Sequence, residues 1–240
     1  MNLVLDIGNT STKMACFEDD TLLSVQTVKS LDAATMSFFC GTKQPEHVYA
    51  SVVGPMPCWE KVLPPDVTVQ TIDATLPLPF ENDYKTPLTL GNDRVAAMVG
   101  ALALYKQTPL LVIDAGSCIT LDYLDERNHY LGGAIMPGLQ MKLNALHTFT
   151  DRLPLIDLCN VDQVPLVGDD TQQCITAGTL TATILALEAF ITKYRRLSSK
   201  PMTVVLTGGD SQLLQSHIDD KVERDPYLVL HGTNAIFRNR

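Results

Sequence analysis

Two short segments place a carboxylate, a glycine and several hydroxyl side chains close together in the chain. Residues 3–12 read LVLDIGNTST and residues 111–120 read LVIDAGSCIT, so Asp, Gly and Thr recur at the same offsets. An Asp-x-Gly turn combines a carboxylate with a permissive backbone and nearby amide donors, which suits a metal-bridged polyphosphate. This chemistry predicts a nucleotide site in which Asp6 orients magnesium or its water shell.

The residues around Asp6 supply the other groups that a polyphosphate needs. Backbone N–H groups and hydroxyls can donate to phosphate oxygens, and Lys13 would neutralise charge if it faces the site. Either segment alone is better explained as an Asx-stabilised turn, because Asp, Gly, Asn and Ser are ordinary turn residues. Their repetition, with a further glycine turn at residues 207–210, favours the nucleotide interpretation. The predicted nucleotide-binding residues of the first segment are Asp6, Ile7, Gly8, Asn9, Thr10, Ser11, Thr12 and Lys13.

The same segments indicate the elements that position these groups. Each begins with an apolar run typical of a buried strand and continues into a second strand-like segment, at residues 13–17 and 121–123. We therefore predict two β-hairpins with polar tips, and their repetition predicts two related α/β halves. Further strands are expected at residues 48–53 and 203–206.

Two helical patterns and a proline-punctuated stretch complete the outline. Residues 92–106 have a helical pattern, and a second long helix is predicted from about Thr171 to Arg196. Asp170 is its expected N-cap, with Gln173 at the reciprocal capping-box position. The prolines of residues 76–87 predict a loop.

The composition is that of an ordinary globular protein. The chain has 240 residues, of which 45% are hydrophobic, so it can bury a sizeable core. A net charge of −9 argues against a nucleic-acid or anionic-membrane partner, because such surfaces are usually basic. The sequence has neither a long apolar run nor a signal-peptide pattern, so we expect a cytoplasmic location.

The six cysteines are scattered and lack the spacing of zinc ligands, so we expect reduced, mostly buried thiols. Cys118, beside Ser117, is expected to be a small buried side chain. The cysteines are Cys16, Cys40, Cys58, Cys118, Cys159 and Cys174.

Four ordered motifs resemble those of type III pantothenate kinases, and the match spans nearly the whole chain. They are residues 6–10 (DIGNT), 91–94 (GNDR), 114–117 (DAGS) and 132–138 (GGAIMPG), and residues 206–210 resemble the family's adenosine-side loop. The resemblance implies an α/β fold, the duplicated ribonuclease-H-like fold of the acetate and sugar kinase/Hsp70/actin superfamily. Two mixed sheets flanked by helices, with a cleft between them, are then expected, in halves 1–108 and 109–240.

The resemblance also implies an activity and its partners. ATP would donate its γ-phosphoryl group to the primary hydroxyl of pantothenate, giving 4′-phosphopantothenate in the first step of coenzyme A biosynthesis. Mg²⁺ would accompany ATP, and K⁺ or NH₄⁺ would activate the enzyme. A homodimer is expected.

Asp93 is the expected general base of this reaction. It opens a helix beside Gly91 and Arg94, and phosphoryl transfer depends chiefly on alignment and charge stabilisation. From the residues alone, Asn92 or Asp93 would instead be an ordinary N-cap. The residues that the resemblance implies for pantothenate binding are Tyr84, Gly91, Asn92, Asp93, Arg94 and Thr171.

Other roles follow from the resemblance alone. Asp114 resembles the family's ligand for the monovalent cation, and an oxygen-rich turn suits a hard cation. Ser117 stands where the family usually has Thr and would bind ATP through its hydroxyl. Asn92 stands where the family often has Ala.

Plainer structural alternatives apply to the same residues. Tyr84 could serve surface packing, Arg94 a surface ion pair and Thr171 only the first turn of a helix. Asp114 could simply cap a turn.

Two other functions remain open from the sequence. The chain could be another kinase or phosphohydrolase of the superfamily with a different acceptor, or an accessory or regulatory protein on the same scaffold, since a fold alone does not establish activity.

Overall fold

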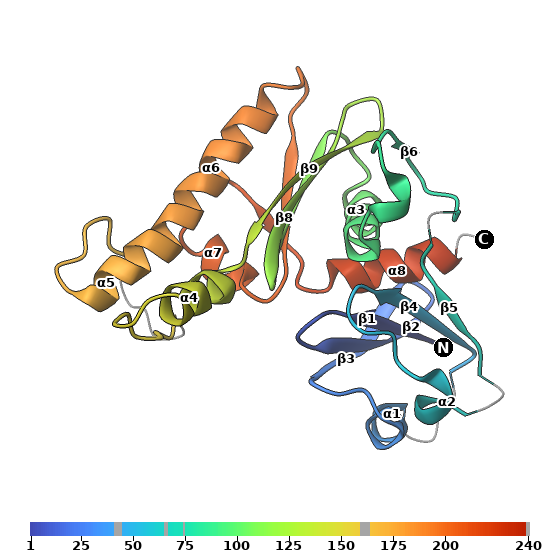
Figure 1. Cartoon of the computed structure of the whole chain (residues 1–240). Coiled ribbons are helices and arrows are strands. Elements are labelled where there is room, and N and C mark those ends of the chain that lie inside the picture. The colour runs from blue at the N-terminus through green and yellow to red at the C-terminus, as the bar shows by residue number, and fades with distance from the viewer. Residues whose placement is uncertain (41–44, 65–66, 74, 159–163, 239–240) are drawn as a thin grey trace. The chain divides into compact units, whose positions relative to one another are not determined.

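The computed structural model describes residues 1–40, 45–64, 67–73, 75–158 and 164–238 (Figure 1). The chain forms two compact units, and each contains one of the Asp-x-Gly hairpins. The first unit comprises residues 1–108, 127–132 and 227–240, and the second comprises residues 109–126 and 133–226.

A mixed five-stranded sheet forms the centre of the first unit. Its strands are β1 (Asn2–Ile7), β2 (Thr12–Glu18), β3 (Thr21–Val28), β4 (His47–Val52) and β5 (Val69–Thr71). The order is β3-β2-β1-β4-β5, with antiparallel pairing among the first three strands and parallel pairing from β1 to β4 and β5. Leu3, Leu5 and Ile7 of β1 point into an apolar cluster on one face of this sheet.

The helices of the first unit include a closely crossing pair, α3 and α8. The helices of this unit are α1 (Ala33–Cys40), α2 (Trp59–Val62), the short 3₁₀ helix η1 (Pro87–Thr89), α3 (Asn92–Tyr105) and α8 (Leu228–Arg238). A Cβ atom at Gly100 would collide with the carbonyl of Leu228, and one at Gly232 would collide with the carbonyl of Ala96. The two helices therefore approach each other closely at these glycines.

The second unit repeats the strand order of the first. Its strands are β7 (Leu110–Ala115), β8 (Cys118–Leu124), β9 (His129–Pro137), β10 (Thr203–Thr207) and β11 (Glu223–Arg224), in the order β9-β8-β7-β10-β11. β7 pairs antiparallel with β8 and parallel with β10, which pairs parallel with β11. Both hairpins and the duplicated ribonuclease-H-like fold are thus confirmed.

The stretch expected to be a loop contains a short strand. β6 (Glu81–Asn82) pairs in parallel with His129 and Tyr130, the first residues of β9, which belong to the first unit. A two-residue strand has no sequence pattern of its own, because only its partner defines it.

The long helix of the second unit is interrupted by a π-helical segment. It consists of α5 (Thr171–Thr176), the π-helix η2 (Ala177–Thr181) and α6 (Ala182–Arg195). The carboxylate of Asp170 accepts a hydrogen bond from the backbone N–H of Gln173 at 2.8 Å, which confirms the predicted N-cap. The remaining helices of this unit are α4 (Leu139–Thr148) and α7 (Ser211–Gln215).

In the described part of the chain, the helix Thr171–Arg195 is long and apolar enough to cross a membrane. Its apolar composition has a simpler cause. Leu180, Leu187 and Ile191 are fully buried in the core of the second unit.

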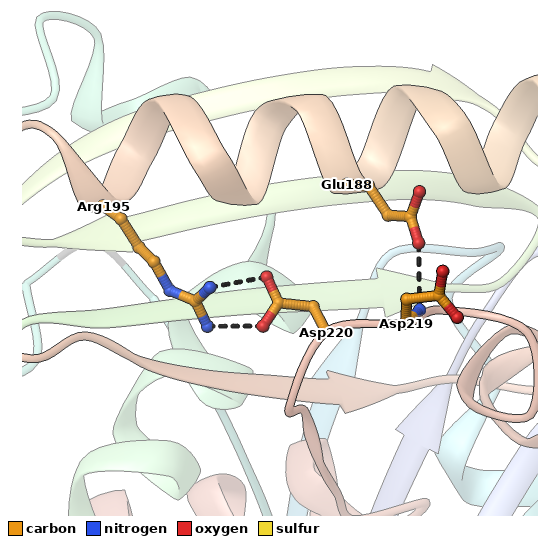
Figure 2. Close-up of polar contacts among 4 residues, drawn as sticks. All are labelled: Glu188, Arg195, Asp219 and Asp220. Carbon is orange, nitrogen blue, oxygen red and sulfur yellow. Dashed lines mark hydrogen bonds and ion pairs between the residues drawn. The ribbon is translucent and has the colours of Figure 1, made fainter.

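Polar contacts fasten α6 to the loop before β11 (Figure 2). Arg195 binds the carboxylate of Asp220 with both terminal nitrogens, at 2.6 and 2.7 Å. About two turns earlier in the helix, Glu188 accepts a hydrogen bond from the backbone N–H of Asp219 at 2.9 Å. Planar two-point contacts of this kind fix geometry as well as charge.

The expectation of mostly buried cysteines is wrong for the described residues. Cys16 is buried and Cys40 half-buried, but Cys58, Cys118 and Cys174 are exposed. Cys118 is exposed at the first position of β8, directly after the hairpin tip. Cys159 lies outside the described residues.

Candidate functional site

The first hairpin holds its polar tip between two fixed strands. Asp6 lies opposite Lys13 and Ile7 opposite Thr12, which leaves a loop of residues 8–11. The backbone N–H of Gly8 donates to the carbonyl of Ser11 at 3.1 Å. The loop exposes Asn9 and Thr10, two of the predicted phosphate donors.

The chain that follows β4 supports this loop from the other side. The backbone N–H groups of Val53 and Gly54 both donate to the carbonyl of Ile7 at 3.0 Å. Gly54 also packs against the backbone of Gly8 so tightly that a Cβ atom would collide with it. The predicted phosphate loop is therefore held in place by backbone contacts.

Asp6 is an unusual carboxylate in this setting. Burial raises its pKa from 3.8 to about 6, the nearby Lys13 opposes that rise, and the charge of Asp93 adds to it. Because Asp93 acts on Asp6, the first unit brings the predicted metal-orienting residue and the predicted general base into one electrostatic environment. Carboxylates with a raised pKa, such as Asp6, are concentrated at functional sites.

The start of α3 is arranged around Asp93. Gly91 is the N-cap residue, and a Cβ atom there would press on the Asp93 carboxylate, so glycine leaves room for it. Asp93 Oδ1 accepts a hydrogen bond from the backbone N–H of Arg94 at 2.8 Å. Neither Asn92 nor Asp93 occupies the N-cap position, so the ordinary capping interpretation does not hold.

Asn92 anchors this helix to the sheet. Its side-chain amide donates to the carbonyl of Ile72 at 2.9 Å and to that of Val52 at 3.5 Å. These carbonyls follow β5 and end β4, respectively. The Asn92 side chain therefore ties the start of α3 to the end of β4, the strand that pairs with β1.

Tyr84 and Arg94 also meet within the first unit. Arg94 is buried, with its guanidinium carbon 5.6 Å from the centroid of the Tyr84 ring, so it is not a surface cation. The ring of Tyr84 lies against Gly132, whose φ of +90° and close approach exclude a side chain. A fixed guanidinium over an aromatic ring suits recognition of a carboxylate.

The second hairpin is similar but tighter. Asp114 lies opposite Thr120 and Ala115 opposite Ile119, so the tip is one residue shorter than in the first hairpin. On its other side, Asp114 is paired with Thr207 of β10. Paired residues of neighbouring strands face the same side of a sheet, so one carboxylate lies between two hydroxyl side chains.

Glycines let three backbone segments meet around this second tip. Gly138 packs against the carbonyls of Gly116 and Ser117, and its N–H donates to that of Ser117 at 3.1 Å. Gly208, with a φ of +92°, packs against Asp114 and Ala115. Backbone segments thus approach closely at Gly138 and Gly208, and Ser117 is exposed at the tip.

Thr171 belongs to the second unit and borders a cavity there. The cavity has a volume of about 630 Å³, with Leu146, Leu153 and Ile175 among its apolar walls and Asp169, Asp170 and Thr171 among its polar ones. Thr171 is exposed in the first turn of α5.

The donors around Asp6 fit magnesium delivered with a nucleotide. Within the described ranges, no group of three or more His, Cys, Asp or Glu side chains is arranged to hold a metal ion. Mg²⁺ usually binds one or two carboxylates and takes its other ligands from phosphates and water. Asp6, beside a loop of amide and hydroxyl donors, suits that mode.

One polar residue of this region was missed from the sequence. Ser51 of β4 is paired with Asp6 across the parallel strands β1 and β4. Its only sequence signal was a hydroxyl side chain within the predicted strand at residues 48–53.

The sequence matches a known enzyme family along most of its length. The profile of the type III pantothenate kinase family matches residues 2–193. The chain is 36% identical over 239 residues to a type III pantothenate kinase of Christiangramia forsetii, covering 98% of this chain and 97% of that one. A type III pantothenate kinase of Bacteroides fragilis is 36% identical over 242 residues, with the same coverage.

Solved structures with the same fold are more distant in sequence. A putative Baf family transcriptional activator from Campylobacter jejuni gives a TM-score of 0.63 at 21% identity, covering 99% of this chain and 98% of that one. A putative N-acetylmannosamine kinase from Listeria monocytogenes gives 0.55 at 13% identity, with the same coverage. These likenesses concern the fold alone.

Proposed function

This chain belongs to the type III pantothenate kinase family, and from that premise we infer that it phosphorylates pantothenate with ATP. The γ-phosphoryl group passes to the primary hydroxyl of pantothenate, giving 4′-phosphopantothenate in the first step of coenzyme A biosynthesis. The observation that carries the residue assignment is the electrostatic coupling of Asp93 to Asp6 in the first unit. Family membership favours this enzyme over an accessory protein.

Asp93 is the general base of the proposed reaction. Its carboxylate accepts the proton of the pantothenate hydroxyl as the oxygen bonds to the γ-phosphorus and ADP departs. The backbone N–H of Arg94 holds one oxygen of Asp93, and Asn92 fixes the helix that carries it. Such positioning matters more than basicity, because phosphoryl transfer gains most from alignment.

The remaining residues bind and orient the two substrates. Arg94, held over Tyr84, pairs with the pantothenate carboxylate, and Thr171 contributes a hydroxyl. The loop from Gly8 to Ser11 donates to phosphate oxygens, while Lys13 and Asp6 lie side by side at its base. Bound magnesium would neutralise phosphate charge, with Asp6 orienting it or its water.

Asp114 is the proposed ligand for K⁺ or NH₄⁺. Its support is the row of Thr120, Asp114 and Thr207 across three strands, which gathers carboxylate and hydroxyl oxygens. Oxygen ligands of this kind suit hard cations. Ser117, at the exposed tip beyond this row, would bind ATP.

A cytoplasmic homodimer is the proposed form of the protein. The exposed apolar side chains of the second unit support self-association, because large exposed apolar groups often mark interfaces. Leu185 of α6 is 52% exposed and Ile135 of β9 is 62% exposed. Light scattering after size-exclusion chromatography gives the mass directly, and a monomer at micromolar concentration would contradict the proposal.

ADP formation in the presence of ATP, Mg²⁺ and pantothenate tests the reaction. We expect turnover that depends on pantothenate and is higher in K⁺ or NH₄⁺ than in Na⁺. Asp93→Asn should lower kcat about 100-fold or more, the range for loss of a general base. Asp151→Asn removes an exposed carboxylate and should leave turnover unchanged.

The outcomes separate the alternatives. ATP turnover that ignores pantothenate would indicate another acceptor, and no turnover in any cation would favour an accessory protein. Full activity of Asp93→Asn would refute the assignment of the base.

A further inference from the structure

Ser51 presents a buried hydroxyl that the fold does not explain. Its side chain is fully buried, and its Oγ has no hydrogen-bond partner among the residues that the structure describes. Native proteins leave few buried polar groups unpaired, and each such group calls for a reason. Alanine would fill the same space in β4 without the desolvated oxygen.

The register of the sheet places this hydroxyl beside the phosphate loop. Asp6 is paired with Lys13 on one side and with Ser51 on the other. Because paired residues face the same side of a sheet, the three side chains form a row across β2, β1 and β4. This face is opposite to the apolar cluster that contains Leu5 and Ile7.

The start of α3 is fastened next to the same hydroxyl. The Asn92 amide donates to the carbonyl of Val52, the residue that follows Ser51. The backbone N–H groups of Val53 and Gly54 hold Ile7, the residue that follows Asp6. Ser51 therefore lies on a strand that is tied both to the helix of Asp93 and to the loop after Asp6.

The second unit has a hydroxyl at the equivalent place. Thr207 of β10 is paired with Asp114 as Ser51 of β4 is paired with Asp6, and it is also buried. In both strand orders, this strand lies parallel to the one that carries the Asp. The duplicated fold thus repeats a carboxylate with a hydroxyl on its parallel neighbour.

We propose that Ser51 is a positioning residue that donates a hydrogen bond to the Asp6 carboxylate when Asp6 engages the magnesium of the nucleotide. This inference rests on the proposed function. A serine hydroxyl rotates freely enough to reach a carboxylate oxygen of a paired neighbour, and the second oxygen of Asp6 then faces the metal or its water. The hydrogen bond fixes the direction in which Asp6 presents that oxygen.

Ser51→Ala tests the proposal with two readouts. We expect the free energy of unfolding without nucleotide to be unchanged or higher, because a buried hydroxyl without a partner is removed. Calorimetry should show affinity for Mg–ADP reduced about tenfold, and half-maximal turnover should need correspondingly more Mg²⁺. The KM for pantothenate should not change. Ser51→Thr keeps the hydroxyl, as Thr207 does in the second unit, and should restore affinity.

Thr233→Ala is the matched control. Thr233 is a fully buried residue of the same unit whose hydroxyl donates to the carbonyl of Val229 at 2.8 Å. Its replacement should lower stability and leave affinity for Mg–ADP unchanged.

Two results would overturn the proposal. Unchanged affinity for Mg–ADP in Ser51→Ala would exclude a role at Asp6, and a stability loss like that of Thr233→Ala would show a structural role instead. Wild-type protein that binds Mg–ADP but does not phosphorylate pantothenate would refute the proposed function alone, because calorimetry would still test Ser51.

Discussion

The ionised carboxylate of Asp6 lowers the stability of the folded chain, because burial partly removes it from water. Its pKa in the folded chain is about 6, against an ordinary 3.8, chiefly because it is buried. Between these values the folded chain holds a proton that the unfolded chain has released, so stability falls as the pH rises. The stabilising contribution is complete below pH 3.8 and is lost as the pH rises through 6.

Asp6→Asn should remove this dependence on pH. We expect the variant to be more stable than the wild type at pH 8, by on the order of 1–2 kcal/mol, because one pKa unit corresponds to 1.36 kcal/mol and Asp6 is only partly shielded from water. At pH 4 the difference should largely vanish. Urea unfolding at both values measures it, with Asp151→Asn as control, and an equal gain at both pH values would contradict the explanation.

Arg94 should be sensitive even to a substitution that keeps its charge. Lysine cannot present a planar guanidinium over Tyr84, so we expect Arg94→Lys to raise the KM for pantothenate about tenfold or more. Affinity for Mg–ADP should stay within twofold, on the order of ordinary scatter among distant substitutions. Arg152→Lys, at an exposed position, is the control. Equal KM values for pantothenate in the two variants would show that Arg94 does not bind pantothenate.

At the scale of elements, the crossing of α3 and α8 holds the helix that begins with the proposed general base Asp93. Gly232→Ala would force a methyl group into the carbonyl of Ala96, so the helices must separate. We expect a loss of about 3 kcal/mol in the free energy of unfolding, at the upper end for overpacking, and a lower kcat because Asp93 moves. Gly178→Ala in η2 meets no atom within 4 Å and should be nearly neutral; a similar loss there would refute the steric argument.

The N-cap of α5 makes a smaller contribution. Asp170→Ala removes the hydrogen bond to the N–H of Gln173, and caps of this kind contribute about 1 kcal/mol. Asp169→Ala, one residue earlier and exposed, should cost almost nothing. Thermal unfolding of the two variants compares them, and equal transition temperatures would contradict a capping role.

Elements with local patterns could be predicted from the sequence, and elements defined by tertiary contacts could not. The two hairpins, α3 and the Asp170 cap have short-range signals, and all are present. Residues 228–238 were not predicted as a helix, although Val229, Ile236 and Phe237 stand at helical spacing. The Gly-Thr-Asn sequence of residues 232–234 consists of weak helix formers. Packing on β1 and α3 provides what local propensity does not.

The candidate site shows the same division. The motifs predicted roles for Asp6 and Asp93, but the effect of Asp93 on the pKa of Asp6 depends on how α3 packs on the sheet, which no local pattern encodes. Ser51 carried no signal, since a hydroxyl in an apolar strand is unremarkable until its pairing with Asp6 is known.

At the scale of the whole molecule, the first unit is assembled from both ends of the described chain. Asn2 of β1 donates to Asn234 of α8 at 3.2 Å, and Tyr49 of β4 stacks on Phe237 at 4.8 Å between ring centroids. The second unit is built almost entirely from the residues between them.

Removal of residues 227–240 should therefore disrupt the first unit and spare the second. We expect amide hydrogens of β1 and α3 to lose protection against exchange, while those of β7 and β10 keep it, because cooperative units open separately. Hydrogen exchange followed by mass spectrometry locates the change. Uniform loss in both units, or none in α3, would contradict this division.

The position of α8 also sets the order in which the two units can fold during translation. Domains generally fold as they emerge, the earliest residues first. Here β1 is translated long before residues 228–238, which pack on one of its faces, whereas residues 109–226 emerge as a nearly continuous block. β1 is thus enclosed only after the second unit has been translated, and a nascent chain interrupted before residue 228 would carry β1, the predicted phosphate loop and α3 without α8, the helix that packs on β1 and α3.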